Sequence, residues 1–227
     1  DPILMADKAV HRAMTACLRV GFLFAVVLIS MARTTCEAQG LNNLWMGGFE
    51  YISGPPWGGS DIEFQSGSAV INAQPARVID LKHTSANITN ANGDLLFFTN
   101  GVVVGMQNGD TIANGAGLNP SVYTNDFYPD GLLLHQGALI VPDPGNVDRY
   151  FLFHCTIDDI MTSSADQLYV TLVDMSLNGG SGEVSQKNQV IHTGNIQAGR
   201  LTAVRHGNGR DWWVYAHEVD TETYWRF

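Results

Sequence analysis

The chain has 227 residues, 45% of them hydrophobic and only 15% charged, so it can bury a core and lacks the composition of an intrinsically disordered protein. Its 22 acidic residues outnumber its 12 basic residues, which gives a formal net charge of −10. Because proteins bind nucleic acid through clustered Lys and Arg, this balance argues against a DNA or RNA partner.

Residues 1–38 predict a secretory signal peptide. Lys8, Arg12 and Arg19 precede a short apolar run at residues 20–29, and small residues follow it before position 39. This apolar run is shorter than the roughly 20 residues that a membrane-spanning helix needs. We therefore expect residues 39–227 to be secreted or extracellular, with the outer-membrane surface as one location. A retained N-terminal anchor is the alternative.

Strand signals dominate the rest of the chain. Short segments rich in Val, Ile and aromatic residues are bounded by Gly, Asn, Asp or Pro. They lie at residues 68–72, 101–106, 138–141, 168–173 and 212–217. No capped segment with helical periodicity extends over three turns, so the sequence predicts an all-β fold. Cys155 lies in another apolar segment, where we expect a buried side chain rather than a reactive thiol.

Three segments share one pattern of a strand, a Gly- and Asn-containing turn and an aromatic strand. They cover residues 86–98, 138–153 and 203–215. The aromatic strands begin at Leu95, Tyr150 and Trp212, which are 55 and 62 residues apart. One small sheet cannot bury both of its faces, but radial stacking covers them, so this spacing predicts a β-propeller with kelch- or WD40-like blades. About three blades do not close a ring, so we expect an incomplete propeller. A β-sandwich is the alternative.

A family resemblance adds to this prediction. Residues 92–101 read N-G-D-L-L-F-F-T-N-G, residues 173–184 read V-D-M-S-L-N-G-G-S-G-E-V, and a later motif contains His217-Glu218. In this order, the segments resemble the N-terminal propeller-like region of secreted surface proteins of gliding bacteria, many of them exported by the type IX system. Asn100 stands where that family usually has Asp, and residues 54–60 look like an insertion. The resemblance implies a surface module for gliding motility or adhesion, with further blades in a longer chain.

Four residues are candidates for ligand contact: Trp57, Trp213, His217 and Glu218. Trp57 is flanked by prolines and glycines, which predicts an exposed loop position. Flat aromatic side chains can stack on a surface glycan or contact a protein partner. The alternatives are core packing for the tryptophans and, for His217, a hydrogen bond to a backbone carbonyl.

Sequence motifs of catalysis are absent: the chain has no nucleophile elbow, no phosphate-binding loop and no zinc-binding histidine pair. Two loops have oxygen ligands suited to Ca²⁺: the acidic loop with Asp158, Asp159 and Asp166, and the Gly-rich residues 178–183. The alternative is that both are solvated turns, and the metal requirement stays open. We predict a noncatalytic binding or scaffolding module without a cofactor. The alternatives are a secreted glycan hydrolase with carboxylates at the propeller mouth, and a structural spacer.

Overall fold

The computed structural model describes residues 43–48, 58–74, 77–127 and 130–227. The chain divides into two units, residues 1–38 and 39–227, and all described residues belong to the second unit. The predicted signal peptide and the candidate residue Trp57 lie outside the described residues.

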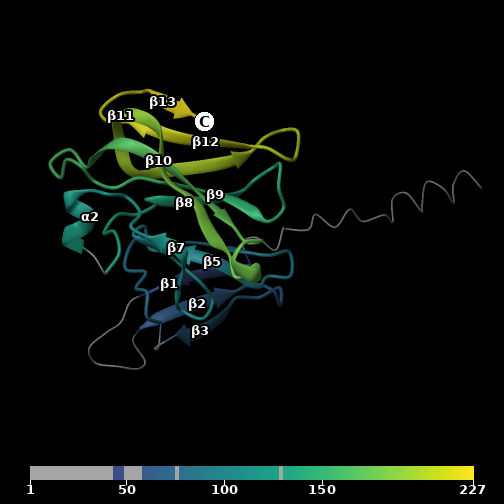
Figure 1. Cartoon of the computed structure of the whole chain (residues 1–227). Coiled ribbons are helices and arrows are strands. Elements are labelled where there is room, and N and C mark those ends of the chain that lie inside the picture. Colours follow the sequence, from purple (N-terminus) through teal and green to yellow (C-terminus); the bar gives the residue numbers. More distant parts are fainter. Residues whose placement is uncertain (1–42, 49–57, 75–76, 128–129) are drawn as a thin grey trace, which may run out of the picture. The chain divides into compact units, whose positions relative to one another are not determined.

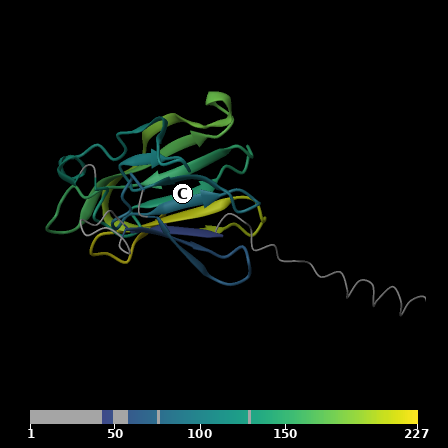
Figure 2. The ribbon, with the colours of Figure 1, turned by 90° about the horizontal axis from the view of Figure 1, so that it is seen from below.

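The described strands form two sheets, which confirms the all-β prediction (Figure 1). The smaller is an antiparallel sheet of β1 (Leu44–Gly47), β2 (Gly59–Glu63) and β3 (Val70–Gln74). The helical segments of the described ranges are α2 (Val122–Phe127), which the sequence did not predict, and a 3-10 turn (Asn178–Gly180). Seen from below, most strands run across the picture and their turns gather at its two ends (Figure 2).

The larger sheet has ten strands in the order β4-β5-β6-β7-β11-β10-β9-β8, with β12 paired to β11 and β13 to β12. Its strands are β4 (Ala86–Thr89), β5 (Leu95–Thr99), β6 (Val103–Gly105), β7 (Thr111–Ala116), β8 (Ala138–Pro142), β9 (Arg149–His154), β10 (Ser164–Asp174), β11 (Glu183–Arg205), β12 (Trp212–Glu218) and β13 (Tyr224–Arg226). Strands β7 and β11 meet in a parallel pairing of Ala113 with Glu183. Because β4 and β8, at the two ends of this order, also contact each other, the sheet is nearly closed and barrel-like.

The three hairpins predicted from the aromatic pattern are confirmed as the antiparallel pairs β4–β5, β8–β9 and β11–β12. Three turns are closed by one kind of side-chain pair, in which an Asn amide donates to an Asp carboxylate. These pairs are Asn90–Asp94 (2.9 Å), Asn108–Asp110 (2.7 Å) and Asn208–Asp211 (2.6 Å). Each turn also has a glycine at positive φ, where a Cβ would be strained: Gly93, Gly109 and Gly209.

The main core joins strands from both ends of the larger sheet. Phe97, Val104, Leu152 and Val173 are fully buried there, and they come from β5, β6, β9 and β10. A second cluster, containing Leu168, Leu201 and Ala216, lies between β10, β11 and β12. Cys155 belongs to this cluster with no exposed surface, and burial raises the pKa of its thiol to about 11. The expectation of a buried cysteine is therefore confirmed, and the raised pKa disfavours the thiolate form.

Besides its short parallel pairing with β7, the long strand β11 has two antiparallel neighbours, because its first part pairs with β10 and its last part with β12. Its register shifts between Ile196 and Leu201, where Gly199 has a φ of +71°. A Cβ at Gly199 would collide with the carbonyl oxygen of His135, which is backbone and cannot move aside easily. This glycine therefore allows β11 to change partners.

We expect Gly199→Ala to lower the free energy of unfolding by about 1–3 kcal/mol, from backbone strain and the collision with His135. Urea denaturation measures this value. Gly207→Ala is the matched control, since no atom lies within 4 Å of its Cβ position and its φ is not positive. Equal stability of the two variants would contradict the role given to Gly199.

Candidate binding site

An apolar cavity of about 200 Å³ lies between the β8–β9 hairpin and strand β12. Its principal lining residues are Pro142, Pro144, Phe151, Phe153, Trp212 and Phe227, and we call it the aromatic pocket. The cavity is smaller than the roughly 300–1,000 Å³ of pockets for drug-sized ligands. It therefore has room for a single ring rather than for a large cofactor.

Strand alternation explains why these aromatic side chains line the pocket. In β9, Tyr150, Leu152 and His154 are buried, so Phe151 and Phe153 project from the opposite face, with ring centroids 6.4 Å apart. In β12, Val214 is 1% exposed and lines the pocket, and Trp212 lies two residues before it on the same face. The two strands thus supply aromatic rings from two sides.

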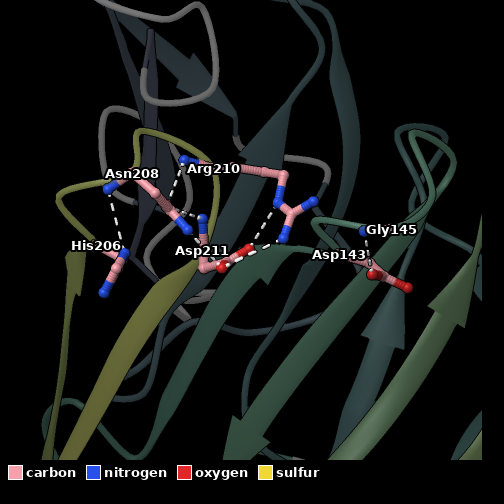
Figure 3. Close-up of polar contacts among 6 residues, drawn as sticks. All are labelled: Asp143, Gly145, His206, Asn208, Arg210 and Asp211. Atoms are coloured by element: carbon pink, nitrogen blue, oxygen red, sulfur yellow. Dashed lines mark hydrogen bonds and ion pairs between the residues drawn. The ribbon is translucent and has the colours of Figure 1, made fainter.

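Hydrogen bonds orient an aspartate carboxylate in each of two neighbouring turns (Figure 3). Asp211 lines the aromatic pocket, whereas Asp143 lies between the lining residues Pro142 and Pro144 without lining it. The Asp211 carboxylate accepts hydrogen bonds from Arg210 Nε (2.8 Å) and Asn208 Nδ2 (2.6 Å). These donors, Arg210 first, hold the pKa of Asp211 below its ordinary value, so it is ionised at neutral pH. Asp143 accepts from the backbone N–H of Gly145 (2.7 Å) and from Arg149 Nε (2.9 Å).

The candidate residue Trp213 projects from the other face of β12, away from the aromatic pocket. The His206 ring lies 5.0 Å from its ring, and the Arg226 guanidinium lies 4.4 Å from its centroid. His217 shares this outer face by strand alternation, so Trp213 and His217 lie on one side of the hairpin. Trp212, its sequence neighbour, is the tryptophan that lines the pocket.

His217 and Glu218 help to close the β12–β13 hairpin. His217 Nε2 lies 2.8 Å from the Thr221 carbonyl oxygen and donates to it, which matches the backbone-carbonyl alternative. The His217 ring also packs against Tyr224, with centroids 4.7 Å apart. The backbone N–H of Glu218 donates to the Thr223 carbonyl (3.0 Å), and its side chain is half-buried.

The acidic loop considered for Ca²⁺ uses its carboxylates to fix its own backbone. Asp158 accepts from the N–H of Asp166 (2.8 Å), and Asp159 accepts from the N–H of Met161 (2.8 Å). The Met161 hydrogen bond is the main cause that lowers the pKa of Asp159. In the part of the chain that the structure describes, no group of three His, Cys, Asp or Glu residues is arranged to hold a metal ion.

A larger cavity of about 490 Å³ lies between the three-stranded sheet and the turns of β4–β5 and β6–β7. We call it the polar pocket, because Asp61, Glu63, Asp94 and Arg77 line it together with several amide side chains. Arg77 forms an ion pair with Asp61 and donates to the Gly47 carbonyl (2.9 Å). Sequence patterns do not indicate this grouping, since Asp94 comes from a turn distant in sequence.

His154 has the most strongly lowered histidine pKa of the described residues, about 3, because it is fully buried. Its Nδ1 lies 2.8 Å from Asn119 Oδ1, and its Nε2 lies 2.8 Å from Thr171 Oγ1. A buried, fully partnered ring cannot reach a ligand. His154 is therefore a structural group rather than a catalytic base.

Comparison with protein families, with curated proteins and with solved structures found no match to this chain. Within the described ranges, no helix has the length and apolar character needed to cross a membrane. The two pockets and the residues around them are therefore the features from which a function is proposed.

Proposed function

We propose that this chain is a noncatalytic binding module, exported to the cell surface, whose aromatic pocket takes one sugar ring of a glycan. The observation that carries the proposal is the placement of Trp212, Phe151 and Phe153 around a cavity that the oriented Asp211 carboxylate also lines. Aromatic faces stack on the C–H face of a sugar, while carboxylates accept hydrogen bonds from its hydroxyl groups. A pocket of about 200 Å³ suits such a ring.

We also propose that the strands belong to a β-propeller whose remaining blades lie in a longer chain. In support, β4–β7 and β8–β11 are each four consecutive antiparallel strands, and β11 continues into the β12 hairpin. The recurring Asn–Asp turn also supports repetition. The resemblance to gliding-motility and type IX surface proteins, and the predicted signal peptide, agree with export and with a role in adhesion.

Glycan hydrolysis is the less favoured function. Glycosidases use a pair of carboxyl groups at the scissile bond. The polar pocket has three carboxylates, but Asp61 is bound to Arg77 and Asp94 accepts from Asn90 Nδ2 (2.9 Å). Of these three, only Glu63 has no hydrogen-bond or ion-pair partner among the described residues. This arrangement supports binding over catalysis.

Titration with soluble gluco-, manno-, xylo- and chito-oligosaccharides, followed by calorimetry, tests the binding proposal. We expect Trp212→Ala to weaken the best ligand at least tenfold, which corresponds to about 1.4 kcal/mol, because the stacking face is lost. Trp213→Ala is the matched control, since this neighbouring ring lies on the opposite face. It should bind as the unchanged chain does.

Two outcomes would count against this assignment. If Trp213→Ala lost binding and Trp212→Ala kept it, the ligand would lie on the outer face with His217. If no oligosaccharide bound at millimolar concentration, the aromatic pocket would not be a glycan site. Reducing-sugar release from any of the oligosaccharides would favour the hydrolase instead.

A further inference from the structure

The polar pocket carries an excess of negative charge at its mouth. Asp61 and Arg77 neutralise each other at its buried side, where their side chains are 13% and 7% exposed. Glu63 and Asp94 are exposed residues that also line the pocket, and no described basic side chain pairs with either of them. Two carboxylates beside low-dielectric walls attract a cation more strongly than isolated surface carboxylates do.

The inner part of the polar pocket is apolar. Leu44, Met46 and Phe98 line it and are 9%, 9% and 2% exposed. An aliphatic stem can lie against these side chains while a charged head remains at the carboxylates, as Lys and Arg side chains do elsewhere. These apolar side chains offer no oxygen ligands to a metal ion, so they favour a ligand that has an apolar part.

Amide groups complete the lining. Gln65, Gln74 and Asn108 contribute side chains, and the Gln65 amide donates to the carbonyl of Asn92 (2.9 Å), which ties the three-stranded sheet to the β4–β5 turn. Amide oxygens accept hydrogen bonds from ammonium and guanidinium groups. With a volume of about 490 Å³, the pocket falls in the range of ligand sites.

We propose that the polar pocket binds a Lys or Arg side chain presented by a partner polypeptide, with the methylene stem on Phe98 and its neighbours and the cationic head at Glu63 and Asp94. This second site differs from the aromatic pocket in both position and ligand chemistry. It would give the chain a protein partner in addition to a glycan. A free aliphatic diamine has the same chemistry and is distinguished by the experiment.

The test uses the whole chain and four probes: Nα-acetyl-lysine amide, Nα-acetyl-arginine amide, the uncharged Nα-acetyl-norleucine amide, and 1,5-diaminopentane. Binding is followed by NMR chemical-shift changes at low salt. We expect the lysine and arginine probes to bind, the norleucine probe to bind at least fivefold more weakly, and 1 M NaCl to abolish the difference. Stronger binding of the diamine than of both amino-acid amides would overturn the assignment to a polypeptide.

Glu63→Gln should weaken the lysine probe at least fivefold, because it removes the unpartnered carboxylate. Glu183→Gln changes the net charge equally at the start of β11, outside the pocket, and should leave binding unchanged. Equal losses in the two variants would show attraction by net charge alone and overturn the site. Oligosaccharide binding by Glu63→Gln should remain intact, so failure of the glycan proposal and failure of this one give different results.

Discussion

Acidification from pH 7 to pH 4 should lower the free energy of unfolding by about 3 kcal/mol through His154 alone. Burial lowers the pKa of this ring to about 3 in the folded chain, against an ordinary value of 6.5. Between these two values the unfolded chain takes up a proton that the folded chain does not bind. The contribution of neutral His154 to the free energy of unfolding is therefore present above about pH 6.5 and is lost as the pH drops toward 3.

The hydrogen bonds around His154 assign its neutral form. Asn119 Nδ2 donates to the Gly101 carbonyl (2.9 Å), so Asn119 Oδ1 faces His154 and accepts from Nδ1–H. Thr171 Oγ1 accepts from the N–H of Asn188 (3.1 Å), so its own proton is free to point at His154 Nε2. A second proton, at Nε2, would remove the hydrogen bond that the Thr171 hydroxyl donates to this nitrogen. No carboxylate is hydrogen-bonded to the ring to stabilise the positive charge. The network therefore opposes protonation.

Urea denaturation at several pH values, with the unchanged chain and His154→Gln, measures the effect. The variant should be less stable at pH 7 by about 1–3 kcal/mol, since it disturbs buried hydrogen bonds. It should also lack the His154 share of the decline below pH 6.5. Asp159 and Asp211, whose pKa values are lowered, also contribute acid sensitivity, but they are present in both proteins and cancel in the difference. Identical pH slopes would refute the assignment.

Much of the fold follows from local sequence patterns. The hairpins at residues 86–98 and 138–153 combine alternating apolar residues with turn residues that accept positive φ, and both signals act over a few positions. Strand β11 lacks the local signal that predicts these hairpins, because its residues are mostly polar and their burial does not alternate regularly. Its pairing with β10 and β12 is set by tertiary contacts and by the bend at Gly199.

The candidate site was only partly accessible from the sequence. The aromatic run of β12 indicates a strand, but the choice between Trp212 and Trp213 depends on which face is buried. The burial of Val214 and Ala216 shows that Trp212 lies on the buried face. The polar pocket includes Asp61 and Asp94, which line one cavity only because a turn of the larger sheet approaches the smaller sheet. No local sequence pattern predicts that residues so far apart in the chain line the same pocket.

Phe97→Ala should lower the free energy of unfolding by about 3–5 kcal/mol, as truncation of a fully buried aromatic side chain does. Phe97 has no exposed surface, and its ring meets the Tyr150 ring edge-on at a centroid distance of 5.6 Å. These rings come from β5 and β9, in different four-stranded groups, so the contact joins the two groups. Removing Phe97 leaves a cavity at this junction that neighbouring side chains cannot fill completely.

Phe153→Ala is the matched control, because it deletes the same atoms from a half-buried ring on the other face of β9. We expect it to cost about 1–2 kcal/mol and to weaken glycan binding, whereas Phe97→Ala should spare the pocket while the chain is folded. Tryptophan fluorescence reports on the surroundings of the five tryptophans, two of which lie in β12, and far-UV circular dichroism reports on all strands. Because the Phe97–Tyr150 contact connects the two groups, both probes should show one shared transition in the unchanged chain. Separate transitions in the unchanged chain would mean that the two groups fold independently and that the Phe97–Tyr150 contact does not couple them.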